Sequence, residues 1–195
     1  MFIVDNTDDN WKALNYLNEW CEISSQFDIA TGYFEISSLI AMDGQWQKLD
    51  KIRILMGDEV SLRTKKAFQR ALSEKLGALN DSMEDEKEGN EFLSGVEAVI
   101  EAFRSKKIEC RVYKKKKFHA KAYITYDRSR VRPPIGLVGS ANFTKSGLSS
   151  NIELNVQIET GADVKILQEW YEKHWEEAED VTEEVLEVIE KHTKE

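Results

Sequence analysis

Three short groups of residues in the second half of the chain have types and spacing that suit chemistry. They are His119-Ala-Lys121, then Gly-Ser140-Ala-Asn142 and, further along, Glu153. An imidazole can act as a nucleophile or proton carrier near neutral pH, and an ammonium beside it can stabilise charge on a phosphoryl oxygen. A carboxylate can accept the imidazole N–H and fix the tautomer of the ring. These residue types together suit phosphoryl chemistry.

Each group, taken alone, also fits a structural role. Many strands present a His-x-Lys pair to solvent, and Gly, Ser and Asn dominate turns for backbone reasons. Strand alternation places His119 and Lys121 on one face of their segment. The opposite face carries the small and apolar residues Phe118, Ala120, Ala122 and Ile124. Glu153 likewise faces away from the apolar residues of its own predicted strand, which are Ile152, Leu154 and Val156.

The charge of the chain is unevenly distributed. Its formal net charge is −9, which taken alone opposes a nucleic-acid partner. Between residues 104 and 132, however, twelve residues are Lys or Arg and only two are acidic. Acidic residues gather instead at 82–91 and 169–195. This asymmetry predicts one side that faces a polyanion and another that faces solvent.

Seven basic residues near the proposed chemistry are the candidates for binding a nucleic-acid backbone. They are Lys114, Lys115, Lys116, Lys117, Arg128, Arg130 and Arg132. A solvated turn is the alternative for the lysine run, and a soluble loop is the alternative for the arginines. The lysine run leads directly into the His-x-Lys segment, which favours contact with phosphates.

The elements that must position these residues alternate between helices and strands. Helical spacing of apolar residues predicts helices near 7–21, 36–46, 61–79, 91–105, 162–178 and 181–192, with a polar surface loop at 80–90. β-Branched or alternating segments predict strands at 27–32, 51–57, 108–113, 118–126, 135–140 and 152–158. The alternation predicts an α/β fold. The buried stripe of the last two helices is predicted to be Trp170, Trp175, Val185, Leu186 and Ile189.

The length of 195 residues suits one domain, which we expect to cover residues 1–160, with a helical extension at 161–195 packed on it. The N-terminus lacks the features of a secretory signal and no segment is apolar for long enough to cross a bilayer, so we expect a cytoplasmic protein. Cys21 and Cys110 lack metal-type spacing and are expected to be reduced packing residues. His174 and His192 are expected on the surface of the C-terminal helices.

The order of the three groups, His-x-Lys, then Gly-Ser-x-Asn, then Glu in the next strand, resembles the phospholipase D superfamily, also called the HKD family. The resemblance covers residues 108–158 directly, and the Ile29-Ala-Thr-Gly-Tyr strand end is similar to the amino-terminal part of nuclease-like members. It implies the fold of that family, a mixed β-sheet sandwiched between helices. It also implies an enzyme that needs no metal or other cofactor. The absence of a cluster of carboxylates and histidines at ligand spacing agrees with this.

The resemblance also implies a role for each residue of the three groups. His119 attacks phosphorus and forms a phosphohistidine. Lys121 and Asn142 hold the non-bridging oxygens, and Ser140 supports them by hydrogen bonding. Glu153 orients His119.

Two features depart from the usual family pattern. The aspartate expected after four intervening residues beyond Lys121 is replaced by Tyr126, and Asp127 lies one place late, so Asp127 is assigned no catalytic role. The motif also occurs only once. A second group must protonate the leaving oxygen and later activate water, and family enzymes use a second histidine for this. We therefore expect a two-fold homodimer that brings two His119 side chains together.

The sequence favours a metal-independent nuclease or nuclease domain that acts on nucleic acid, DNA more than RNA. Similar domains of the family occur in restriction endonucleases and in helicase-like proteins, so the chain could belong to a longer protein. A second hypothesis, prompted by Tyr126, is a non-cleaving DNA-binding or scaffold domain of a helicase or restriction system. A third is a phospholipase or phosphatidyltransferase, although no amphipathic helix with a basic face indicates membrane binding.

Overall fold

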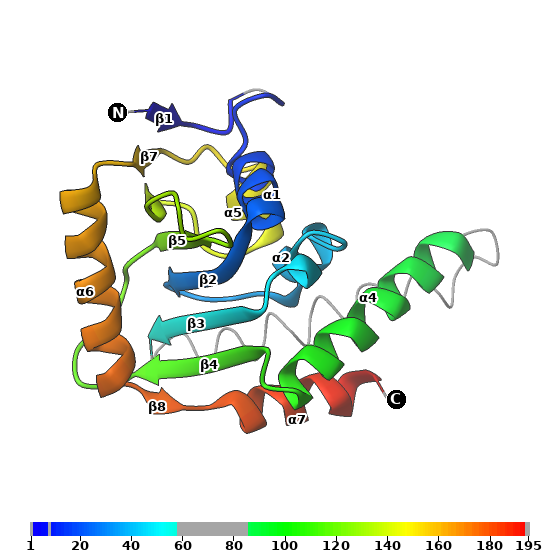
Figure 1. Cartoon of the computed structure of the whole chain (residues 1–195). Helices are drawn as coiled ribbons and strands as arrows, with labels where there is room; N and C mark the ends of the chain where they lie inside the picture. Colours follow the sequence, from blue (N-terminus) through cyan, green and yellow to red (C-terminus); the bar gives the residue numbers. More distant parts are fainter. Residues whose placement is uncertain (1, 8, 58–85, 194–195) are drawn as a thin grey trace.

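The computed structural model describes residues 2–7, 9–57 and 86–193 (Figure 1). The helix predicted at 61–79 and residues 80–85 of the predicted polar loop lie outside the described residues. Residues 86–90 of that loop belong instead to helix α4 (Glu86–Arg104), so the loop prediction is wrong there. Glutamate and lysine favour helices, and this segment begins with both.

Within the described residues, an eight-stranded mixed sheet forms the centre of the molecule. In spatial order its strands are β1 (Phe2–Val4), β7 (Asn155–Ile158), β6 (Ile135–Gly139), β5 (Ala122–Asp127), β2 (Ser24–Thr31), β3 (Lys51–Gly57), β4 (Ile108–Tyr113) and β8 (Glu179–Asp180). The neighbours β2, β3 and β4 are parallel, and the other neighbouring pairs are antiparallel. The predicted α/β fold with a mixed sheet is confirmed.

Helices cover both faces of this sheet (Figure 1). One face, with Phe27 and Ile29 of β2, packs against α1 (Ala13–Ile23), α2 (Ile36–Ala41), α4 and α7 (Thr182–Thr193). The other face, with Ala30 of β2, packs against α6 (Gly161–Glu177). Two shorter helices are η1 (Trp46–Lys48) and α5 (Lys145–Ser149). Because successive strand side chains alternate between faces, each buried strand contributes to both layers.

The register of the strands brings four chain segments to one end of the sheet. Ala30, near the end of β2, pairs with Ala122, the first residue of β5. Ala122 in turn pairs with Val138 near the end of β6, and Gly139 pairs with Asn155 at the start of β7. The residues that follow β2 and β6 therefore lie beside those that precede β5 and β7. Since β4 is parallel to β3 and β2, it also ends on this side.

Two predicted strands begin later than their patterns indicate. Residues 118–121 precede β5, although Phe118 packs on the α6 side of the sheet as alternation predicts. Residues 152–154 precede β7, and their apolar side chains do not pack into the core, because Ile152 is 94% exposed and Leu154 59% exposed. Asn155 occupies the buried position instead, where its side chain donates to the carbonyl oxygen of Val4 and accepts from the amide of Ala141.

The C-terminal segment uses both faces of the sheet. Of the predicted apolar stripe, Trp175, Leu186 and Ile189 are buried, while Trp170 and Val185 are half-buried. The two-residue strand β8 between α6 and α7 pairs with β4, so this segment also adds an edge to the sheet. The division at residue 160 stays a prediction.

Both cysteines lie in the hydrophobic core, Cys21 on α1 and Cys110 on β4. Cys21 and Cys110 are free and buried, and burial raises the pKa of the Cys21 thiol to about 12 and that of Cys110 well above its usual range. Among the helices of the described residues, none is long and apolar enough to span a bilayer.

Candidate active site

His119 and Lys121 lie together at the sheet end where β2 and β6 finish. The Lys121 Nζ atom is 2.8 Å from Nδ1 of His119 and 3.1 Å from the carbonyl oxygen of His119. The backbone of Lys121 is fixed to the end of β6, because its carbonyl oxygen accepts from the amide of Gly139. The Lys121 side chain is largely buried, whereas His119 is exposed. A ligand can therefore reach the imidazole while the ammonium is held beneath it.

The electrostatics of this pair favour a neutral imidazole. The ammonium of Lys121, then burial and then Lys117, lower the pKa of His119 below its ordinary value of 6.5. Burial also lowers the pKa of Lys121, and the charge of Glu153 opposes that effect. An unprotonated imidazole keeps the nitrogen lone pair that a nucleophile needs, so a neutral His119 suits attack on phosphorus near neutral pH.

Asn142 is oriented by the end of β2. Its Oδ1 atom accepts from the amide of Gly32 at 3.0 Å and from the hydroxyl of Thr31 at 3.4 Å. The Nδ2 group of the same amide is therefore directed away from Gly32, and no described residue forms a hydrogen bond with it. This leaves two N–H donors for an oxygen of a ligand.

Gly32 is a site residue that the motif does not contain. A Cβ atom built on Gly32 would lie 2.8 Å from Oδ1 of Asn142, 3.4 Å from Nζ of Lys121 and 3.6 Å from Cδ2 of His119. A side chain at position 32 would therefore meet the three side chains best suited to the chemistry. The signal in the sequence was a glycine at the end of a buried strand, which permits such close approach but does not say to what.

Ser140 and Glu153 form a second pair at the same end of the sheet. The hydroxyl of Ser140 donates to Oε2 of Glu153 and accepts from the amide of Leu154 at 3.0 Å. The other carboxylate oxygen of Glu153 accepts from the amide group of Asn151 at 3.3 Å. Within the described residues, neither a hydrogen bond nor an ion pair joins Glu153 to His119. The single chain thus gathers the predicted residues but does not make the predicted contact between these two.

The structure separates the seven predicted basic residues into two groups. Residues 114–117 are exposed, follow the end of β4 and lead into His119. Lys114 and Lys115 form ion pairs with Glu179 and Glu177.

The arginines Arg128, Arg130 and Arg132 follow the other end of β5, roughly 20 Å along the strand from Lys121. Arg128 donates there to the backbone carbonyl oxygens of Ser24 and Lys48. The chain therefore does not bring these arginines to the site.

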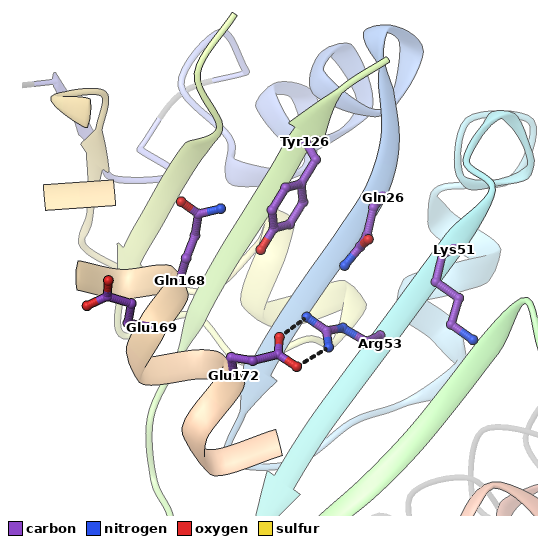
Figure 2. A pocket seen from close by; sticks show the side chains of 7 residues that line it. All are labelled: Gln26, Lys51, Arg53, Tyr126, Gln168, Glu169 and Glu172. Atoms are coloured by element: carbon purple, nitrogen blue, oxygen red, sulfur yellow. Dashed lines mark hydrogen bonds and ion pairs between the residues drawn. The ribbon is translucent and has the colours of Figure 1, made fainter. Parts of the chain in front are cut away.

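Tyr126, at the usual aspartate position, belongs to a buried polar network on the α6 side of the sheet. Its hydroxyl donates to Oδ2 of Asp28, which lies on the neighbouring strand β2 and is fully buried. Arg53 on β3 donates to both oxygens of Asp28 at 2.8 and 2.7 Å and to Glu172 of α6. Figure 2 shows Arg53 reaching Glu172 across the hollow that Tyr126 also lines. A carboxylate therefore lies beside Tyr126, but it belongs to Asp28 of β2.

Of the two histidines expected on the surface of the C-terminal helices, His174 has structural contacts. His174 is half-buried, its Nδ1 lies 2.7 Å from the carbonyl oxygen of Trp170, and its ring lies against Trp170 and Tyr113. His174 belongs to α6 and is only half-buried, so the prediction of a surface residue is partly right. The side chain of His192 lies outside the described residues.

Most of the chain matches a known protein family. Residues 21–175 match the model of the family described as cardiolipin synthase, PLD-like domain. The chain belongs to the phospholipase D-like family. No curated protein matches it. Family membership supports phosphodiesterase chemistry in general, and it confirms the resemblance seen in the order of the three motif groups.

Solved structures share the phospholipase D-like fold at low sequence identity. NucT from Helicobacter pylori has a TM-score of 0.54 and 17% identity, with 86% of this chain and 90% of that chain covered. TrmBL2, described as an archaeal chromatin protein with a novel mode of DNA binding, has a TM-score of 0.51 and 15% identity, with 92% and 54% covered. Phosphatidylserine synthase from Haemophilus influenzae Rd KW20 has a TM-score of 0.54 and 12% identity, with 99% and 44% covered.

Proposed function

We propose that this chain is a metal-independent phosphodiesterase that cleaves nucleic acid, DNA in preference to RNA, through a phosphohistidine at His119. The observation that carries the proposal is the convergence of His119, Lys121 and Asn142 at one sheet end, around a position, Gly32, where an added Cβ would approach all three. A nucleophile, a buried cation and an amide donor are the groups that an in-line attack on phosphorus requires.

In the proposed reaction, the unprotonated nitrogen of His119 attacks phosphorus and the bond from phosphorus to the leaving oxygen breaks. The leaving oxygen takes a proton from a general acid and departs as an alcohol. Lys121 and Asn142 hold the non-bridging oxygens, where negative charge builds in the transition state. The same acid, now a base, removes a proton from water, which attacks phosphorus and releases the phosphate ester from His119.

We infer that a second copy of the chain supplies the general acid. The described residues place no second histidine at the sheet end, and the imidazole of His119 is exposed. The apolar side chains of Ile152 and Leu154 are also exposed beside Glu153, which suits burial against another copy. Glu153 does not contact the His119 of its own chain, and in a two-fold pair it would face the partner's His119.

A nucleic-acid substrate is supported by the charge around the sheet end. The exposed run 114–117 lies next to His119, so the phosphates that flank the scissile bond would meet lysine side chains. The arginines at the far end of β5 do not support this role. The prediction that a longer native protein contains this domain also belongs to this proposal.

Cleavage of labelled DNA in excess EDTA tests the function. The wild-type chain is expected to cleave, and His119→Ala is expected to lose cleavage by several orders of magnitude while its thermal unfolding is unchanged. His192→Ala is the matched control, because His192 belongs to α7, which packs on the face of the sheet opposite to α6. Equal cleavage by wild type and His119→Ala would remove the mechanism.

A non-cleaving DNA-binding domain is the second candidate. It is favoured by the similarity of the fold to TrmBL2, whose description names DNA binding. The replacement of the usual aspartate by Tyr126 is weaker support for a non-cleaving domain, because the carboxylate of Asp28 accepts a hydrogen bond from Tyr126. Salt-sensitive DNA binding without cleavage or phosphohistidine would support this candidate over the first.

A further inference from the structure

A groove of ≈ 640 Å³ adjoins the proposed nucleophile on the α6 side of the sheet. His119 and Lys121 are among the residues that line it. Apart from Asp163, its other lining residues are apolar, and they include Ile158 from β7 with Ile166, Leu167 and Trp170 from α6. The groove is therefore continuous with the site, but it has a different chemical character.

The wall of this groove is held in place by aromatic packing. The indole of Trp170 stacks on Phe118, with ring centroids 5.9 Å apart and an angle of 23° between the rings. His174 packs against the same indole at 4.5 Å. Phe118 directly precedes His119 in the chain, so the indole lies close to the nucleophile along the chain. A side chain fixed in this way loses little conformational freedom when a flat ligand binds against it.

We infer that this groove binds an unpaired nucleobase next to the scissile phosphate, an inference that rests on the proposed phosphodiesterase function. The base packs against Trp170 and the aliphatic side chains of α6 while its phosphate meets His119 and Lys121. A base in a duplex is stacked and paired, and it cannot enter a groove beside its own backbone phosphate without leaving the helix. The substrate class is therefore single-stranded nucleic acid.

The charges near the groove favour a nucleobase over a phosphate or a lipid as its occupant. Asp163 lines the groove, and its carboxylate repels a phosphate but can accept from the amino groups that bases carry. Exposed carboxylates outnumber lysines on α6, which opposes contact with an anionic membrane surface. The carboxylates are Asp163, Glu169, Glu172 and Glu176, and the lysines are Lys165 and Lys173. An acyl chain would need α6 to approach such a surface.

The test uses two substrates and the intact chain in EDTA. One substrate is a single-stranded oligonucleotide, and the other is a phosphodiester chain of the same length with abasic units throughout. The wild type is expected to show a kcat/KM about 10- to 100-fold higher for the oligonucleotide, the range that base–aromatic stacking gives. Trp170→Leu and Ile166→Ala should reduce this ratio but cleave the abasic chain at the wild-type rate, and Trp170→Phe should restore much of it.

The controls distinguish the groove from the fold and from the function. Trp11 is a partly exposed tryptophan that stacks on Phe2 and does not line the groove, so Trp11→Ala should retain the wild-type ratio. An equal loss on both substrates in Trp170→Leu and no loss in Ile166→Ala would mean that Trp170 only supports Phe118, which would overturn the inference. Equal wild-type rates on both substrates would also overturn it. No cleavage of either substrate would remove the proposed function, and release of a lipid headgroup that depends on Trp170 would assign the groove to an acyl chain.

Discussion

Replacing Gly32 by alanine tests how closely the site is packed at the end of β2. The new Cβ would lie 2.8 Å from Oδ1 of Asn142, which is shorter than an ordinary carbon–oxygen contact. The Asn142 amide would have to move by roughly 0.5 Å to restore such a contact. Its 3.0 Å hydrogen bond from the amide of Gly32 would lengthen as a result. The Nδ2 donors of Asn142 would then no longer be aimed where the proposed oxyanion develops.

The size of the effect follows from the cost of misplacing one donor. Removal of a donor to a developing oxyanion lowers kcat by about 10²- to 10³-fold, and a displacement of about 1 Å can cost about 10²-fold. For the smaller shift expected here, we predict a decrease in kcat of about 10- to 100-fold. The free energy of unfolding should change by no more than about 1 kcal/mol, because Gly32 does not have positive φ and alanine restricts the unfolded chain.

Cleavage of a single-stranded oligonucleotide in EDTA gives kcat, and urea denaturation gives the free energy of unfolding. Gly44→Ala is the matched control. Gly44 has φ of +78° with no atom within 4 Å of a built Cβ, so this variant should lose about 1 kcal/mol of stability and keep its kcat. In an Asn142→Ala background, Gly32→Ala should cost little further activity. Full activity of the Gly32→Ala single variant would refute the packing argument.

Three other positions give separate tests. Lys121 lowers the pKa of His119 below 6.5, so His119 loses its proton at a lower pH than an ordinary imidazole. Lys121→Gln should therefore raise the pKa of His119, measured by NMR, toward 6.5. An unchanged pKa would contradict the electrostatic account. Tyr126→Phe removes a hydrogen bond to buried Asp28 and should cost about 1.5–3 kcal/mol in urea denaturation at unchanged kcat, whereas lost activity at full stability would argue against a structural role. Ile152→Glu should reduce the dimer fraction in sedimentation and the activity together, with stability within about 0.5 kcal/mol, and a fully active monomer would disprove the need for a partner.

Two strands could be predicted from the alternation of apolar and charged residues. Residues 51–57 and 108–113 predict β3 and β4 with their observed bounds, because Lys51 and Arg53, and Glu109 and Arg111, alternate with buried apolar residues. The pairing of His119 with Lys121 was also predictable, since both alternation and an extended backbone direct two residues at this spacing to one side. The family order of the motif groups then pointed to the same end of the sheet.

The features that the sequence did not reveal depend on contacts between distant segments. The hydrogen bond from Gly32 to Asn142 joins residues 110 positions apart, and no local pattern encodes it. The carboxylate of Asp28 serves the network of Tyr126 from a neighbouring strand, which the spacing within one motif cannot show. Edge strands such as β1 and β8 exist because a partner strand is present, and they have too few residues to show a period of their own.

The exposed position of Ile152 marks the limit of reasoning from alternation. Alternation assumes that a strand is continuous, but the structure begins β7 only at Asn155. The buried residue at the start of β7 is Asn155, whose side chain forms hydrogen bonds with Val4 and Ala141. The apolar residues before it were left on the surface, where a second copy of the chain can use them.

The central claim is that His119 becomes covalently bound to phosphorus. Mixing the chain with end-labelled single-stranded DNA in EDTA, stopping the reaction within its first turnovers at alkaline pH and mapping the labelled peptide by mass spectrometry tests it directly. We predict an acid-labile phosphoryl adduct on the peptide that contains His119, which is absent from His119→Ala. DNA cleavage without any adduct, or with an adduct on another residue, would contradict the account.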